Sequence, residues 1–135
     1  MRAIAAEQLS VFLENRRGIV ADICAALTER EIHIRGLTVL DTHDISTLRM
    51  VVDNPELAKD VLGPMGKGAA VMSVPVITVK ISNKHGAFAR VTRKFADAGI
   101  NIEYVYATVG PEAEHTVGVF RVSDQEAALQ IEFDD

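Results

Sequence analysis

The 135-residue sequence predicts an α+β fold built from two βαββαβ units in tandem, the first over residues 1–74 and the second over residues 75–135. An internal repeat is the main observation behind this prediction. Residues 9–41 overlay residues 77–109 at an offset of 68, and after a two-residue insertion the overlay resumes at an offset of 70. In both copies the apolar spacing changes from strand-like to helical in the same order. Identical residues coincide at Asn15 and Asn83, Gly18 and Gly86, Ala21 and Ala89, Ile32 and Ile100, and Ile34 and Ile102.

The first copy opens with a predicted strand, turn and helix. Residues 8–14 (QLSVFLE) are rich in apolar and β-branched side chains, which is typical of a strand. Residues 15–18 (NRRG) have the composition of a turn. The apolar residues that follow recur with helical spacing and predict a helix with one apolar stripe. The stripe consists of Ile19, Val20, Ile23, Cys24 and Leu27.

A hairpin follows this helix in the prediction. Residues 34–41 and 45–52 form two strands separated by the turn sequence DTHD. Residues 54–56 (NPE) open a second helix, with a proline in its first turn and an acid near its start, and the glycine-rich residues 63–68 end it. A strand over residues 69–74 completes the order of a ferredoxin-like unit.

The second copy repeats this order but is shorter. Its predicted elements are a strand over 76–82, a helix over 87–98, strands over 101–109 and 116–122, and a helix over 124–131. Only residues 132–135 (EFDD) follow, which are too few for a clear final strand. The second sheet is therefore expected to leave an edge open or to borrow a strand from the first unit or from a partner chain. This edge and the apolar mean hydropathy of +0.15 lead us to expect a homodimer.

The amino-acid composition limits the kinds of partner that the protein is expected to bind. With 14 Lys and Arg against 19 Asp and Glu, the formal net charge is −5, which argues against a nucleic acid or an anionic membrane surface. The single cysteine, Cys24, cannot form an intrachain disulfide, and no signal or membrane-spanning segment is found, so a cytoplasmic protein is expected. The four histidines lack the spacing of a zinc site, and neither a metal nor a cofactor is predicted.

The turn between the first strand and the first helix of each copy is the strongest candidate for chemistry. Asn15-x-x-Gly18 and Asn83-x-x-Gly86 lead into a helix whose first N–H groups lack intrahelical partners and whose dipole is positive there. Such an end can hold a carboxylate, and a carboxamide offers both a donor and an acceptor to an amino acid. Asn and Gly are also common in turns, and Asn can simply cap a helix, so binding and structural roles both stay open.

The strand–turn–helix segment VFLENRRG and the segment DAGINIEY (residues 97–104) resemble those of ACT domains, the βαββαβ modules that sense amino acids. The resemblance covers nearly all of residues 7–131 and identifies the chain as a tandem ACT protein. Members of the family generally bind a small molecule where the turn of one unit meets the start of the second strand of its neighbour. On this chain the resemblance implies a ligand-binding set made of Asn83, Lys84, His85, Gly86 and Ala87 with Asn101, and of Asn15, Arg16, Arg17, Gly18 and Ile19 with His33.

Two departures from the family pattern affect these sites. The family motif is usually N-x-P-G, and its proline is replaced by Arg17 in the first copy and by His85 in the second. His33 stands where the second copy has Asn101, so the second copy matches the family better and the two sites need not bind the same ligand.

The resemblance implies an amino-acid-binding regulatory protein with no catalytic activity of its own. One alternative is a regulatory subunit of a biosynthetic enzyme, similar to the small subunit of acetolactate synthase. A second is a small enzyme resembling acylphosphatase, which is disfavoured because its GxVQGVxxR loop is absent from ENRRGIVAD. An RNA-binding βαββαβ module is also disfavoured, because ISTLRMVV has no aromatic residue and TVGVFRV has only Phe120.

Overall fold

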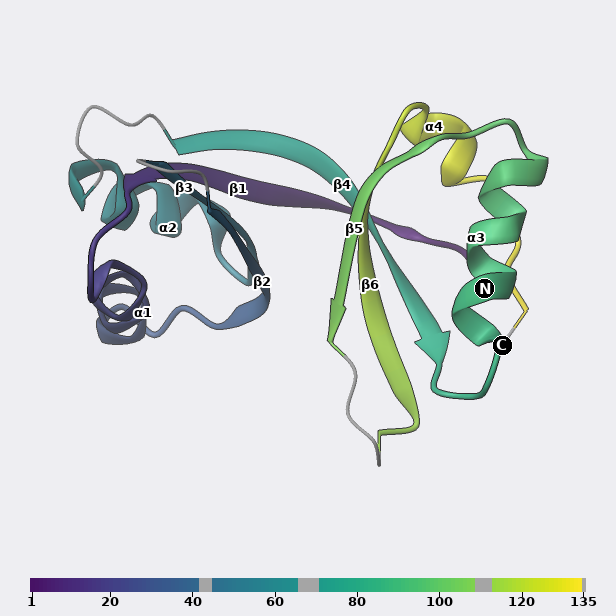
Figure 1. Ribbon diagram of the computed structural model, residues 1–135, viewed down its shortest axis with the longest axis horizontal. Coiled ribbons are helices and arrows are strands. Elements are labelled where there is room, and N and C mark those ends of the chain that lie inside the picture. The colour runs from purple at the N-terminus through teal and green to yellow at the C-terminus, as the bar shows by residue number, and fades with distance from the viewer. Residues whose placement is uncertain (42–44, 66–70, 109–112, 135) are drawn as a thin grey trace. The chain divides into compact units, whose positions relative to one another are not determined.

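The computed structural model describes residues 1–41, 45–65, 71–108 and 113–134 (Figure 1). By contact, the chain divides into two compact units, one formed by Glu7–Val74 and the other by Met1–Ala6 together with Pro75–Asp135. This division assigns residues 1–6 differently from the predicted units, which follow the chain in order. The predicted α+β class with two units of ferredoxin-like order and an antiparallel sheet is confirmed.

The unit Glu7–Val74 has the βαββαβ order. Its strands lie in the order β2-β3-β1-β4, and β3 pairs antiparallel with both β1 and β2. The elements are β1 (Ile4–Glu14), α1 (Ile19–Glu29), β2 (Ile34–Asp41), β3 (Ile45–Val52), α2 (Pro55–Leu62), the 3-10 turn η1 (Gly63–Met65) and the first residues of β4 (Val71–Ser82).

The core of this unit follows the two predicted periodicities. Alternate residues of β1 and every fourth residue of α1 are buried against each other, which is the packing expected when a helix covers one face of a sheet. Asn54 caps α2, because its side-chain oxygen accepts a hydrogen bond from the N–H of Leu57 at 3.2 Å. The buried apolar residues of β1 and α1 are Leu9, Val11, Leu13, Ile19, Ile23 and Leu27.

The second unit repeats this arrangement with different residues at the same positions. Its strand order is β1-β4-β6-β5, and β6 pairs antiparallel with β4 and β5. Its core is formed mainly by alternate residues of β4 and by one stripe of α3. The elements not yet given are α3 (Ala87–Asp97), β5 (Ile102–Thr108), β6 (His115–Val122) and α4 (Gln125–Ala128).

In this second unit the strand beside β4 comes from the first residues of β1. No strand forms between α4 and Asp134 in the part of the chain that the structure describes. The Thr78 hydroxyl lies 3.4 Å from the Ile4 carbonyl oxygen, and the N–H of Phe133 donates to the Met1 carbonyl oxygen at 2.7 Å. An exposed ion pair of 2.8 Å joins Arg2 to Glu132. Residues 1–6 therefore occupy the place that the final strand has in a ferredoxin-like unit.

Several elements differ from their predicted bounds. The first strand, predicted over residues 8–14, begins earlier and is β1 (Ile4–Glu14). The strands predicted over 69–74 and 76–82 are one strand, β4, which continues through Pro75; the Pro75 carbonyl oxygen accepts a hydrogen bond from Arg121 at 2.8 Å. The helix predicted over 124–131 is only the four-residue α4, because the chain beyond it turns to bury Phe133. Asp41, the first residue of the predicted turn DTHD, ends β2; residues 42–44 and the end of the predicted glycine-rich segment lie outside the described residues.

Glu7 joins three elements of the unit Glu7–Val74. The Ser73 hydroxyl on β4 donates to Glu7 Oε2 at 2.6 Å, and Lys59 Nζ of α2 lies 2.9 Å from the same oxygen. Lys59 also pairs with Glu56 at 3.0 Å. The hydrogen bond from Ser73, followed by that from Lys59, lowers the pKa of Glu7 below its ordinary value of 4.5.

Within the described residues no helix is long and apolar enough to cross a membrane.

We expect replacement of a buried alanine in the first six residues to destabilise the second unit. Ala3 is 8% exposed and belongs to the core that contains Phe133, whereas Ala5 is exposed. Ala3→Asp would bury a carboxylate and lower the free energy of unfolding by at least about 2 kcal/mol. The matched variant Ala5→Asp should change it by about 0.5 kcal/mol or less. Equal stability of the two variants in urea unfolding would contradict the packing of residues 1–6.

The contribution of Glu7 to stability should depend on pH. Its pKa is lower in the folded than in the unfolded chain, so its contribution is present above the unfolded pKa and is lost as pH falls through the folded pKa. Glu7→Gln should be less stable than the original chain at pH 7, and this difference should shrink between about pH 5 and pH 3. Urea unfolding over a pH series measures the difference. Glu29→Gln is the control, and a pH-independent difference for Glu7→Gln would contradict the prediction.

Candidate functional site

The two strand–helix turns have the same backbone geometry. Gly18 has φ 85° and ψ −3°, and Gly86 has φ 82° and ψ −3°, a left-handed conformation that favours glycine. Each glycine directly precedes its helix, and no side chain caps the start of α1 or α3. The N-cap residue of each helix is thus a glycine, and neither Asn15 nor Asn83 holds that position.

Asn83 ties its turn to the residues before β6. Its N–H donates to the carbonyl oxygen of Glu114 at 2.9 Å, and its side-chain Nδ2 donates to the carbonyl oxygen of Ala113 at 2.8 Å. These two bonds orient the turn that leads into α3. One of the two N–H donors of the carboxamide thus serves the fold.

The charges beside the two turns differ between the repeats. At the first turn Arg16 pairs with Asp22 of α1 at 3.3 Å, and both side chains are about half exposed. The equivalent residues at the second turn are Lys84 and Arg90, two cations that cannot pair with each other. The start of α1 is therefore neutralised by the chain itself, whereas the start of α3 keeps its positive charge.

His33 and Asn101 occupy matching positions at the start of a strand. The N–H of His33 donates to the Asp53 carboxylate, and the N–H of Asn101 donates to the Ser123 hydroxyl, each at 3.0 Å. In turn, the N–H of Asp53 donates to the carbonyl oxygen of His33 at 3.2 Å, and the N–H of Ser123 donates to the carbonyl oxygen of Asn101 at 3.0 Å. The side chains of His33 and Asn101 are exposed.

Within one unit the structure does not bring the turn and the strand start together. In the second unit the turn lies before α3 and Asn101 lies after it, at opposite ends of a helix of 11 residues (Figure 1). At about 1.5 Å per residue, this helix separates them by about 16 Å. The predicted site residues 83–87 are therefore contiguous, and Asn101 is remote from them; α1 separates the residues of the first unit, 15–19, from His33 in the same way.

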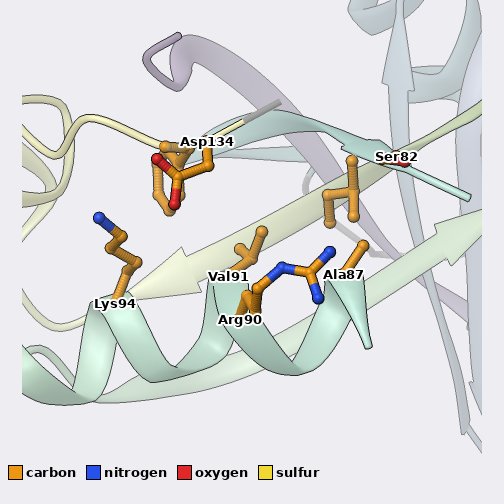
Figure 2. Close-up of a pocket in the computed structure, with 8 residues that line it drawn as sticks. Ser82, Ala87, Arg90, Val91, Lys94 and Asp134 are labelled. Carbon is orange, nitrogen blue, oxygen red and sulfur yellow. The ribbon is translucent and has the colours of Figure 1, made fainter. Parts of the chain in front are cut away.

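A groove lies beside the second turn, between α3 and the last described residues (Figure 2). Counted with its open side it has a volume of about 320 Å³. Its apolar floor is buried and its charged rim is exposed. The lining residues are Ile81, Ser82, Ala87, Arg90, Val91, Lys94, Phe133 and Asp134.

Of the residues that the resemblance implied for this unit, only Ala87 lines the groove. The charged residues Arg90, Lys94 and Asp134 were not predicted. A signal for the two cations is present in the sequence, since residues 80–96 contain five Lys and Arg and no acid in a chain of net charge −5. No pattern along the chain indicates that Asp134 would lie opposite them.

Comparison with known proteins gives matches over nearly the whole chain. The model of the family described as "ACT domain pair" matches residues 4–134. Protein BT0572 from Bacteroides thetaiotaomicron is similar over 95% of this chain and 86% of its own, with 28% identity and a TM-score of 0.84. The ligand-free regulatory subunit of aspartate kinase from Thermus thermophilus is similar over 96% of this chain and 95% of its own, with 18% identity and a TM-score of 0.69.

The regulatory subunit of aspartate kinase from Thermus flavus is similar over 96% of this chain and 94% of its own, with 19% identity and a TM-score of 0.61. Because these two subunits are only 18% and 19% identical to this chain, the comparison with them shows that the fold is alike. Among curated protein sequences no match is found.

The left-handed turn before α3 should not tolerate a side chain. Gly86→Ala places a Cβ at φ 82° and 3.2 Å from Arg90 Nη1, and we expect a loss of about 1–2 kcal/mol in the free energy of unfolding. The control is Gly63→Ala, where no atom lies within 4 Å of the added Cβ and φ is −51°. Urea unfolding should show this control unchanged or more stable by about 0.4–1 kcal/mol. Equal stability of the two variants would mean that the turn does not depend on Gly86.

Proposed function

The chain belongs to the ACT-domain family, and from this premise we propose that it is a regulatory protein that binds an amino acid and has no catalytic activity of its own. The observation that carries the proposal is the start of α3, which has no side-chain cap and is flanked by Lys84 and Arg90. The N–H of Ala87 already donates to the Lys84 carbonyl oxygen at 3.0 Å, but the positive end of the helix dipole still attracts an anion, and the two nearby cations add to that attraction. The α-carboxylate of an amino acid is an anion of suitable size.

The second turn is a better candidate than the first for this role. Asp22 offers a negative charge beside the start of α1 and already pairs with Arg16, so a ligand carboxylate there would meet repulsion. At the second turn both positions are cationic. We therefore place the principal site at residues 83–87, and we assign residues 15–19 a weaker one.

A complete site of the family type requires a second unit. Because α3 holds Asn101 about 16 Å from the turn of its own unit, a ligand that contacts both residue types must lie between two units. We propose that a homodimer supplies the neighbour. Its test is sedimentation with and without the ligand, and a chain that stays monomeric when saturated would contradict this part of the proposal.

A second candidate function is regulation of a biosynthetic enzyme as its separate subunit. The observation in its favour is the likeness of fold to a regulatory subunit of aspartate kinase, which extends over 96% of this chain. In this case the amino acid would alter binding to a catalytic partner. Affinity capture with the tagged full chain, with and without the amino acid found to bind, distinguishes this function from that of a free-standing sensor.

Thermal unfolding in the presence of each of the twenty amino acids tests the proposal. A ligand that binds only the folded chain stabilises it by about 2.7 kcal/mol at 100 times its Kd, which gives a clear rise in Tm. Asn83→Ala should then weaken binding by about 1–3 kcal/mol, measured by calorimetry, through the lost polar contact. The control is Lys80→Gln, an exposed cation outside the turn and the groove. No shift with any amino acid at millimolar concentration would contradict the proposal.

A further inference from the structure

Two cations on α3 distinguish the second unit from its repeat. Arg90 and Lys94 are one helical turn apart, and the equivalent positions of α1 hold Asp22 and Ala26. Like charges at this spacing repel each other and weaken a helix by a few tenths of a kcal/mol. Since α1 has the same length and the same glycine start without such a pair, the fold does not require the cations.

These cations line a groove whose opposite side carries one acid. The side chains of Arg90 and Lys94 rise from α3 and the Asp134 carboxylate lies across from them, above the floor of the groove (Figure 2). In the part of the chain that the structure describes, none of the three takes part in an ion pair. Among the described residues that line it, the groove therefore has two positive charges and one negative charge outside any ion pair; Arg93 and Asp97 lie beside it, in a hollow that Arg90, Lys94 and Asp134 also line.

The groove adjoins the proposed binding turn. Ala87, the first residue of α3, lines it, and Arg90 Nη1 lies 3.2 Å from the position that a Cβ on Gly86 would take. The guanidinium thus lies over the positive end of the helix, where a carboxylate is favoured. The floor is apolar, because Val91 and Phe133 are 6% and 4% exposed, and it can pack against methylene groups.

We propose that the ligand of this site is an acidic amino acid, glutamate or aspartate; this rests on the proposed function and extends its site into the groove. The charges match one to one, with the guanidinium of Arg90 holding one carboxylate, Lys94 the other, and Asp134 the ammonium group. A neutral amino acid would leave one cation unpaired, and a dicarboxylate without an amine would face Asp134 with no cation. The space that the groove encloses is small, about 20 Å³, and the rest is open to solvent, so the ligand would lie along the charged rim and not in a closed pocket.

Calorimetric titration of the full chain with glutamate and aspartate tests the proposal, with glutarate, inorganic phosphate, alanine and leucine as further arms. Arg90→Gln and Lys94→Gln should each weaken binding of the acidic amino acid by about tenfold or more, whereas Lys80→Gln should leave it unchanged. Asp134→Asn should reduce the preference for glutamate over glutarate by about tenfold. The double variant Arg90→Asp/Lys94→Ala carries the residues of the first repeat, which preserves the fold, and should abolish binding.

The outcomes separate this proposal from the proposed function. Tighter binding of alanine or leucine than of glutamate and aspartate, lost in Asn83→Ala but kept in the double variant, would overturn the acidic ligand and leave the amino-acid sensor standing. Equal affinity for glutarate, phosphate and glutamate would mean that the groove binds anions without recognising the ammonium group, and this result would also overturn the acidic-amino-acid proposal. If none of the amino acids binds at a concentration on the order of 10 mM, both proposals are contradicted.

Discussion

The left-handed glycine between the first strand and the first helix is the constraint on which each unit depends. Positive φ at Gly18 and Gly86 lets the chain leave a strand and enter a helix within a few residues. This reversal lays α1 and α3 over their sheets, with Ile19 and Ala87 buried in the first turn. The N-cap glycine of each helix has no side chain to cap it, and the first N–H of each helix donates to a carbonyl oxygen of the turn, from Ile19 to Arg16 and from Ala87 to Lys84. One local conformation thus gives both the packing of the helix and the candidate binding site.

The two cores show how much freedom this constraint leaves. Leu48 and Met50 on β3 correspond to Gly118 and Phe120 on β6, so a small residue beside a large one replaces two of medium size. The Phe120 ring fills the space over Gly118, where an added Cβ would lie 2.6 Å from it. Phe120 also packs against Phe95 at a centroid distance of 5.1 Å. The side chains at these positions differ between the units, and in the second unit the Phe120 ring takes the space that Gly118 leaves, as close packing requires.

Local charge matters more than net charge at the candidate site. A chain of net charge −5 is expected to repel anions at long range, yet the segment that leads into and forms most of α3 has cations and no acid. At distances beyond about 8–10 Å salt screens the average field, whereas a bound ligand responds to the groups it touches. At the start of α1 the situation differs, because the ion pair of Arg16 with Asp22 neutralises the positive charge there without a ligand.

The sequence by itself determined the repeat, the periodicity of most strands and helices, and the two glycine turns, because spacing of apolar residues and the need for positive φ are local properties. It also pointed to Asn83 and its neighbours as a site. Only the tertiary structure decided that residues 1–6 lie beside β4, that α4 ends early so that Phe133 reaches the core, and that Asp134 lies across a groove from Arg90 and Lys94. These contacts join residues far apart in the chain, and they depend on which surfaces can be buried together, a property that no short segment contains.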